Sequence, residues 1–205
     1  MRPVQKVGLY ALVGIMAFAL IFALLPTPGL DASQSGARLS GVQLRLYPSG
    51  DSNATWSFRA ADVRNDPVAG LTTLTGITDG KRLLKEQVQG RFTGRETLDA
   101  TLATPELTID SQDTMTTRQA RITLVQQCAD IDLKGTEQDP VKIEQGQGFS
   151  APTARISSPN TNGRIGKLKM TFGFVIEDSD PANSKYTAGL DATETCRDGK
   201  RVPLT

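Results

Sequence analysis

The stretch "GKLKMTFGF", residues 166–174, alternates between apolar and polar positions. Every second residue is apolar, namely Leu168, Met170, Phe172 and Phe174, and the residues between them are Lys, Thr or Gly. Successive side chains of a strand point to opposite faces, so this period of two predicts a β-strand with one apolar face. That face contacts either the core of the protein or an apolar ligand.

Similar alternating runs recur along the chain on the N-terminal side of this stretch. They lie at residues 42–46, 56–60, 98–102, 107–109, 120–124, 131–133, 141–143 and 149–156. Turn-forming residues such as Pro48, Asn65, Gly80 and Gly163 separate them. Short strands at this spacing predict an antiparallel all-β protein of the sandwich or barrel type. The segment 81–92 fits either a short helix or a strand, and we favour the strand.

Composition limits the possible functions. The chain has 205 residues, of which 38% are hydrophobic and 22% are charged, with a net charge of +1. These values are typical of a globular protein, and such a small net charge provides no overall field for nucleic acid. Aromatic residues make up 5% and include one Trp, which argues against a stacking platform for bases. We therefore expect no nucleic-acid partner.

The sequence contains no His, which is the most frequent general base and the most frequent metal ligand. It also contains neither a glycine-rich phosphate loop nor a nucleophile elbow. We therefore expect no enzymatic activity, no catalytic residues, no metal and no cofactor.

Residues 7–25 form an apolar run without a charged residue. As a helix this run would be about 28 Å long, close to the thickness of a bilayer core. Arg2 and Lys6 precede it, and the next cation is Arg38. The positive-inside rule then places the N-terminus in the cytoplasm and the rest of the chain on the far side of the membrane. The alternative is a cleaved signal peptide, whose apolar region is ordinarily shorter.

The expected organisation has five parts. A cytoplasmic stub at 1–6 precedes the transmembrane helix at 7–25 and a linker at 26–37. A β-domain at 38–176 and a polar tail at 177–205 follow. In an exported domain Cys128 and Cys196 can form a disulfide, which would add roughly 4 kcal/mol by closing a long loop. The alternative is two separate thiols.

Several stretches resemble a known family. They are "TWSFRAADVR" at 55–64, "LTTLTGIT" at 71–78, "LATPELTID" at 102–110, "TTRQARITL" at 116–124, and "DPVKIEQGQGFSAPTARIS" at 139–157 followed by "GRIGKLKMTF". Together with the apolar run at 7–25, they resemble the LptC-like and OstA-type bridge proteins of lipopolysaccharide export, over roughly residues 5–176. The tail at 177–205 and the two cysteines depart from the family pattern.

The resemblance implies an antiparallel β-jelly roll shaped like a V, preceded by one transmembrane helix of the inner membrane. It also implies a periplasmic domain that accepts a lipid from an ATP-driven (ABC) transporter and passes it along an apolar groove. The partners would be transporter subunits, further jelly-roll proteins paired strand edge to strand edge, and the lipid itself. The candidate groove residues are Trp56, Phe58, Ile122, Leu124, Leu168, Met170, Phe172 and Phe174.

A second interpretation remains open. An alternating apolar face in a β-protein is most often plain core. The domain would then be an anchored structural or adhesive part of the cell envelope, with a closed core and no ligand.

Overall fold

The computed structural model describes Ile15, Met16, Phe18, Leu20 and residues 37–189 and 192–204. The chain divides into two compact units, Met1–Ser35 and Gly36–Thr205. The four described residues of the first unit are helical and exposed. Most of the predicted transmembrane segment therefore lies outside the described residues, as do the stub and all but the last residue of the linker. Within the described part, no helix combines the length and apolar character that a membrane crossing requires.

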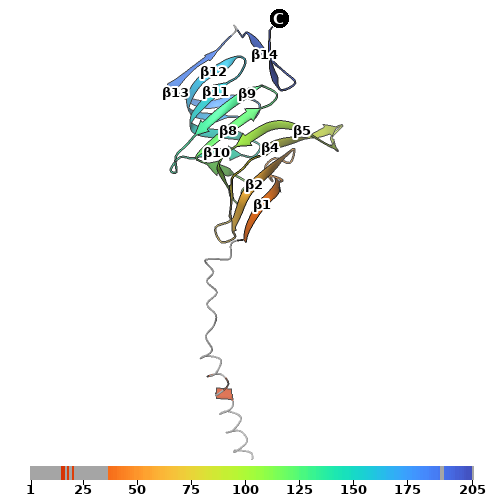
Figure 1. Ribbon diagram of the computed structural model, residues 1–205, viewed down its shortest axis with the longest axis vertical. Helices are drawn as coiled ribbons and strands as arrows, with labels where there is room; N and C mark the ends of the chain where they lie inside the picture. Colours follow the sequence, from red (N-terminus) through yellow and green to blue (C-terminus); the bar gives the residue numbers. More distant parts are fainter. Residues whose placement is uncertain (1–14, 17, 19, 21–36, 190–191, 205) are drawn as a thin grey trace, which may run out of the picture. The chain divides into compact units, whose positions relative to one another are not determined.

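The second unit is all-β, as the alternation predicts, and its strands pair antiparallel (Figure 1). The strands are β1 (Ala37–Leu46), β2 (Ala54–Asp66), β3 (Leu71–Thr75), β4 (Gly80–Val88), β5 (Arg91–Ala103), β6 (Glu106–Ile109), β7 (Met115–Thr117), β8 (Gln119–Leu124), β9 (Ala129–Lys134), β10 (Val141–Glu144), β11 (Gly148–Ser157), β12 (Thr161–Met170), β13 (Ile176–Ala188), β14 (Glu194–Arg197) and β15 (Lys200–Pro203). The first thirteen form one sheet, and β14 pairs with β15 in a separate hairpin. The segment 81–92 is a strand hairpin, as favoured above.

Two rows of strands share β2 on one side and β11 on the other. The first row, here called the first arm, runs β2–β4–β5–β8–β9–β11. The second arm runs β2–β3–β6–β7–β10–β11. One half of β2 pairs with β4 and the other half pairs with β3, while β1 covers the opposite edge. The half-strands of β11 divide in the same way between β9 and β10.

The chain passes from one arm to the other at corresponding points of neighbouring strands. In β2 the inward residues step from Ala60 to Val63, in β11 from Ala151 to Ala154, and in β12 from Ile165 to Leu168. Each odd step breaks the period of two, as bends and bulges do where a strand turns a corner between sheets. We call this line of breaks the crease. Gly41 and Gly76, both with a positive φ, lie on it in β1 and after β3.

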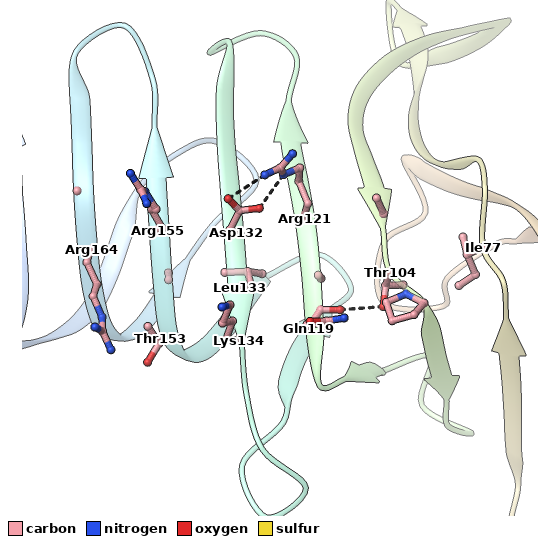
Figure 2. A pocket seen from close by; sticks show the side chains of 15 residues that line it. Ile77, Thr104, Gln119, Arg121, Asp132, Leu133, Lys134, Thr153, Arg155 and Arg164 are labelled. Carbon is pink, nitrogen blue, oxygen red and sulfur yellow. Dashed lines mark hydrogen bonds and ion pairs between the residues drawn. The ribbon is translucent and has the colours of Figure 1, made fainter.

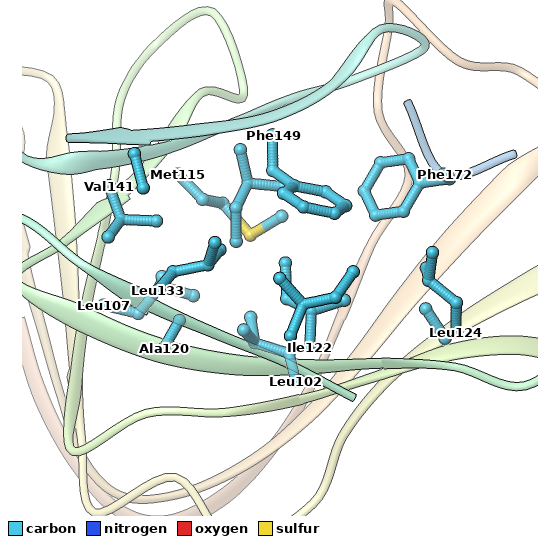
Figure 3. Close-up of a cluster of buried hydrophobic side chains, with 14 of the residues drawn as sticks. Leu102, Leu107, Met115, Ala120, Ile122, Leu124, Leu133, Val141, Phe149 and Phe172 are labelled. Carbon is cyan, nitrogen blue, oxygen red and sulfur yellow. The ribbon is translucent and has the colours of Figure 1, made fainter. Parts of the chain in front are cut away.

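The core fills the space between the two arms (Figure 3). Val141, Met115 and Phe149 of the second arm face Ile122 and Leu124 of the first. All five side chains are buried. The apolar faces predicted from alternation therefore pack against one another across the interior of one folded sheet.

The structure corrects the reading of residues 166–174 as one strand. The strand β12 ends at Met170, and a turn follows in which Phe174 N–H donates to Thr171 O and Thr171 N–H donates to Val175 O. Lys167 and Phe174 both have a positive φ, which shifts the register within the strand and in the turn. Phe172 lies in this turn and is buried although it is not part of a strand. For this reason the apolar alternation in the sequence runs on past the end of the strand.

The residues expected to form a polar tail extend the sheet. The edge strand β13 pairs with β12, so the last strand of the sheet is β13 and the boundary expected at 176 falls inside the domain. The hairpin of β14 and β15 is attached by the expected disulfide between Cys128 and Cys196, whose Cα atoms are 5.5 Å apart. Arg201 also donates to the carbonyl oxygens of Cys128 and Ser157.

Candidate functional site

The eight predicted groove residues all lie in or against the core between the arms. Trp56, Phe58, Ile122, Leu124, Leu168 and Met170 are buried, and Phe172 is 8% exposed. Phe174 is half-buried and packs against the same cluster. The two halves of the set come from opposite sides of the interior, since Trp56 and Ile122 belong to the first arm and Met170 pairs with Phe149 of the second.

Aromatic rings gather where the arms meet away from the crease. Trp56 stacks on Phe58 with ring centroids 5.6 Å apart. Phe172 meets Trp56 edge to face at 6.0 Å and Phe149 at 5.6 Å. Such pairs add about 0.5–1.5 kcal/mol each beyond the area that they bury. The ring of Phe172 thus connects the two arms through the interior.

Polar side chains join the same ends of the arms at the surface. Ser49, in the turn between β1 and β2, donates from its backbone N–H and from its hydroxyl to Asp113 Oδ2, both at 2.9 Å. Trp56 Nε1–H donates to Gln145 Oε1 at 2.9 Å, and Gln145 Nε2 donates to Asp113 O at 3.1 Å. We call these four residues the rim latch, because they connect the turns at the free ends of the two arms.

A buried ion cluster lies beside the rim latch. Arg82 of β4 contacts Asp51 Oδ2 at 2.6 Å and also pairs with Asp99. Its guanidinium carbon lies 4.2 Å from the ring centroid of Phe172, and its side chain is 8% exposed. A register shift in β5 opposite Arg82 leaves Asp99 outside the ladder, which lets its carboxylate turn toward Arg82. The charges of Arg82, Asp51 and Asp99 therefore pair with one another.

A second feature is an open trough of about 1040 Å³ on the outer face of the first arm, next to the crease (Figure 2). It crosses β5, β8, β9, β11 and β12. Its polar lining consists mainly of Gln119, Arg121, Asp132, Lys134, Arg155 and Arg164. Within this lining four residues are cationic and one is anionic.

The one acid of the trough is already paired. Arg121 Nε and Nη2 donate to the two oxygens of Asp132 at 2.6 and 3.0 Å. These hydrogen bonds, assisted by the charges of Arg121, Arg155 and Lys134, hold the pKa of Asp132 below its ordinary value, and the same contact raises the pKa of Arg121. Asp132 is therefore ionised near neutral pH, and both of its carboxylate oxygens accept hydrogen bonds from Arg121.

The interior is lined by apolar side chains, and the charged lining of the trough is mainly cationic. Among the described residues, no group of His, Cys, Asp and Glu is arranged to hold a metal ion. The half-buried carboxylates of Asp51 and Asp99 both pair with Arg82. The side chains of the core fill the interior between the arms, whereas the open trough can attract an anion.

Sequence reasoning found the interior but missed the trough, the rim latch and Arg82. The cations of the trough occupy the polar positions of the predicted strands, where charged residues are unremarkable. Their proximity depends on strand register, which alternation alone does not fix. Arg82 sits at an inward position of a strand, and a charged residue there is the one local signal that could have drawn attention to it.

No known family model matches the sequence, and no curated protein is significantly similar to it.

Proposed function

We propose that the protein is a membrane-anchored lipid-transfer component of the cell envelope, with residues 7–25 as its transmembrane helix. In this proposal the folded sheet is a V-shaped jelly roll on the periplasmic side of the inner membrane, and the space between its arms holds the acyl chains of a lipid during transfer. The cargo class that the resemblance implies is lipopolysaccharide or a related lipid, delivered by an ABC transporter. The protein itself performs no catalysis.

The observation that carries the proposal is the placement of the core between two arms that meet at a noncovalent rim. The arms share strands only at β2 and β11. Away from the crease they are joined by the rim latch and by the packing of Phe172 on Trp56 and Arg82. If these contacts separate, the apolar interior opens along the length of the rim without any backbone pairing being broken.

The energies involved make such an opening feasible with a lipid present. Exposing one aromatic side chain of about 150–250 Å² costs roughly 4–6 kcal/mol at 25 cal/mol per Å². Trp56, Phe149 and Phe172 would together cost roughly 12–18 kcal/mol. One acyl chain of about sixteen methylenes returns roughly 13 kcal/mol at 0.8 kcal/mol each. Measured from water, one or two acyl chains therefore offset the exposure of these three rings.

Both outer edges of the sheet support the proposed partners. Within the described residues β1 pairs only with β2, and β13 pairs only with β12. Free strand edges present unpaired N–H and C=O groups that can pair with a strand of another chain. One edge would meet the transporter and the other the next bridge protein.

Site-specific photocrosslinking in cells tests the proposal. A photoreactive residue at Ile122, which is buried and faces the interior, is expected to capture a lipid. The matched control is the next residue, Thr123, which points to the opposite face of β8. Equal capture at both positions, or none at Ile122, would contradict the proposal.

The second candidate is an anchored structural domain with a permanently closed core. The observation that favours it is the burial of Trp56, Leu74, Leu107, Ile122 and Ile131, each 0% exposed. This candidate predicts that no lipid is captured from the interior and that nothing co-purifies with the chain.

A further inference from the structure

One row of side chains crosses the outer face of the first arm from β8 to β11 and continues over β12 and β13, which extend the sheet beyond β11. The strand registers place Arg121 opposite Asp132, Asp132 opposite Arg155, Arg155 opposite Arg164, and Arg164 opposite Lys185. Directly opposite residues of paired strands project from the same face, and neighbouring strands lie about 4.8 Å apart. The row therefore ends in three consecutive cations spanning roughly 10 Å.

Arg155 lies opposite Asp132, but the carboxylate of Asp132 is hydrogen-bonded to Arg121, and no acid in the part of the chain that the structure describes forms an ion pair with Arg155, Arg164 or Lys185. Arg155, Arg164 and Lys185 are exposed, and none of them takes part in an ion pair or a side-chain hydrogen bond there. In Figure 2 the side chains of Arg155 and Arg164 turn in opposite directions from adjacent strands. Like charges directly opposite one another destabilise a sheet, so the row carries a repulsion that an anion would relieve.

At the other end of the row, Arg121 has the kind of acidic partner that Arg155, Arg164 and Lys185 do not have among the described residues. There Asp132 satisfies Arg121 with two parallel hydrogen bonds to its guanidinium group. A phosphate group offers oxygens in a similar arrangement, and guanidinium groups bind phosphate through the same fork. Lys134, on the trough wall beside Asp132, adds a fourth cation without an ion pair among the described residues.

We propose that the trough is a binding site for a ligand that carries two or more phosphate groups. Two of the three cations, Arg155 and Arg164, line the trough, and Lys185 follows next in the row on β13. Together they match more than one negative charge, and the trough has the volume of a small-molecule site. Its lining contains no aromatic side chain, so it offers no surface on which a nucleobase would stack. The site lies on the face opposite the apolar interior, and it does not depend on the lipid-transfer proposal.

Calorimetric titration of the full-length chain in neutral detergent tests the site, with inorganic tripolyphosphate as the probe. The test variant replaces the three cations of the row: Arg155→Gln, Arg164→Gln and Lys185→Gln. Charge-assisted hydrogen bonds contribute about 1.5–3 kcal/mol, so the affinity is expected to fall at least about tenfold for each cation removed. The matched control, Arg91→Gln with Arg95→Gln and Lys200→Gln, removes the same charge from exposed positions outside the trough and is expected to bind like the wild type.

A second titration distinguishes the two sources of such a ligand. Detergent micelles containing cardiolipin, which has two phosphates, are compared with micelles containing phosphatidylcholine. Binding of tripolyphosphate alone supports a soluble phosphorylated ligand, and cardiolipin-dependent binding alone supports a lipid headgroup. Binding of both supports the shared chemistry, provided that the test variant loses it and the control variant retains it. Binding of neither probe, or an equal loss in both variants, would overturn the proposal.

The repulsion provides a separate readout that confirms folding of the variant. Because the three substitutions remove like charges that face one another, the test variant is expected to melt at or above the wild-type temperature in low salt. A lowered melting temperature together with lost binding would show that the row is structural, and would also contradict the proposal.

Discussion

At the scale of single residues, Arg82 connects the inner face of β4 to the rim of the interior. It brings a positive charge to the inner face of β4, where Asp51, Asp99 and the ring of Phe172 surround it. Its Nε is buried and has no hydrogen-bond partner among the described atoms. Burying a charge is costly unless its partners remain in place, so this cluster stabilises only as a unit.

The substitution Arg82→Met is therefore expected to destabilise the fold by up to about 3–5 kcal/mol, because it leaves two half-buried carboxylates without a partner. Urea unfolding followed by fluorescence of the single Trp measures this loss. The control is Arg45→Met, which breaks an exposed, solvent-screened ion pair with Glu96 and is expected to lower the free energy of unfolding far less. Similar costs for the two variants would mean that the cluster is not structurally important.

Asp132 makes the stability of the fold depend on acid pH. Arg121 lowers the pKa of Asp132 in the folded state, so the carboxylate contributes stability above its ordinary pKa of about 4, and this contribution is lost as the pH falls through the lowered pKa. The difference in unfolding free energy between wild type and Asp132→Asn is expected to narrow between pH 6 and pH 2.5. A difference that stays constant with pH would contradict this assignment, and Asp139→Asn, without an ion pair in the described structure, serves as the control.

At the scale of elements, the close approach of β11 to β12 depends on a glycine. Gly148 has a φ of +148°, and a Cβ there would lie 2.1 Å from the carbonyl oxygen of Met170. Neither backbone can move without disturbing the pairing of Phe149 with Met170. The close contact at Gly148 therefore holds the end of β12, and with it the turn that contains Phe172, against β11 of the second arm.

The substitution Gly148→Ala is expected to cost at least about 1–3 kcal/mol, through strained backbone and contact with a carbonyl oxygen. Thermal unfolding measures the effect. Gly173→Ala, in the following turn, is the control, since a Cβ there meets only Thr171 Oγ1 at 3.5 Å. Equal melting temperatures for the two variants would contradict the role given to Gly148.

The hairpin of β14 and β15 is expected to depend on its disulfide. Replacing both Cys128 and Cys196 by Ala should reduce stability by about 2–4 kcal/mol and increase amide exchange in this hairpin before the rest of the sheet. Arg201→Ala, which removes the hydrogen bonds to Cys128 O and Ser157 O while keeping the disulfide, is expected to have a smaller effect. Unchanged exchange in the double variant would mean that other contacts hold the hairpin.

Strand content was predictable because alternation is a local property, and nearly all predicted runs are strands. The strand β13 was missed because its sequence, "IEDSDPANSKYTA", is polar and contains a proline, as suits an edge strand. The turn at Thr171–Val175 was missed because Phe172 keeps the apolar period although the backbone has left the sheet. The trough and the rim latch depend on which strands are neighbours, and no local pattern encodes that.

At the scale of the whole β-unit, a single sheet folded along its crease explains why one core contains residues from nearly every strand. The inward faces of both arms are apolar, and their outer faces are charged, with the basic row on the first arm. The crease keeps the arms connected while the rim depends on side-chain contacts. Opening at the rim is the motion that lipid transfer requires and that a structural domain would not need.

Locking the rim tests this account most directly. Ser49 and Asp113 already touch across the rim, so Ser49→Cys with Asp113→Cys is expected to form a disulfide between the arms on oxidation. The measurement is lipid capture by a photoreactive residue at Ile122 in the full-length chain, with the rim locked or released by mild reduction. The same reduction of the chain without the two new cysteines controls for loss of the native Cys128–Cys196 disulfide. We predict that locking abolishes capture and that reduction restores it. Equal capture in the locked and released states would contradict the claim that the interior takes up lipid through its rim.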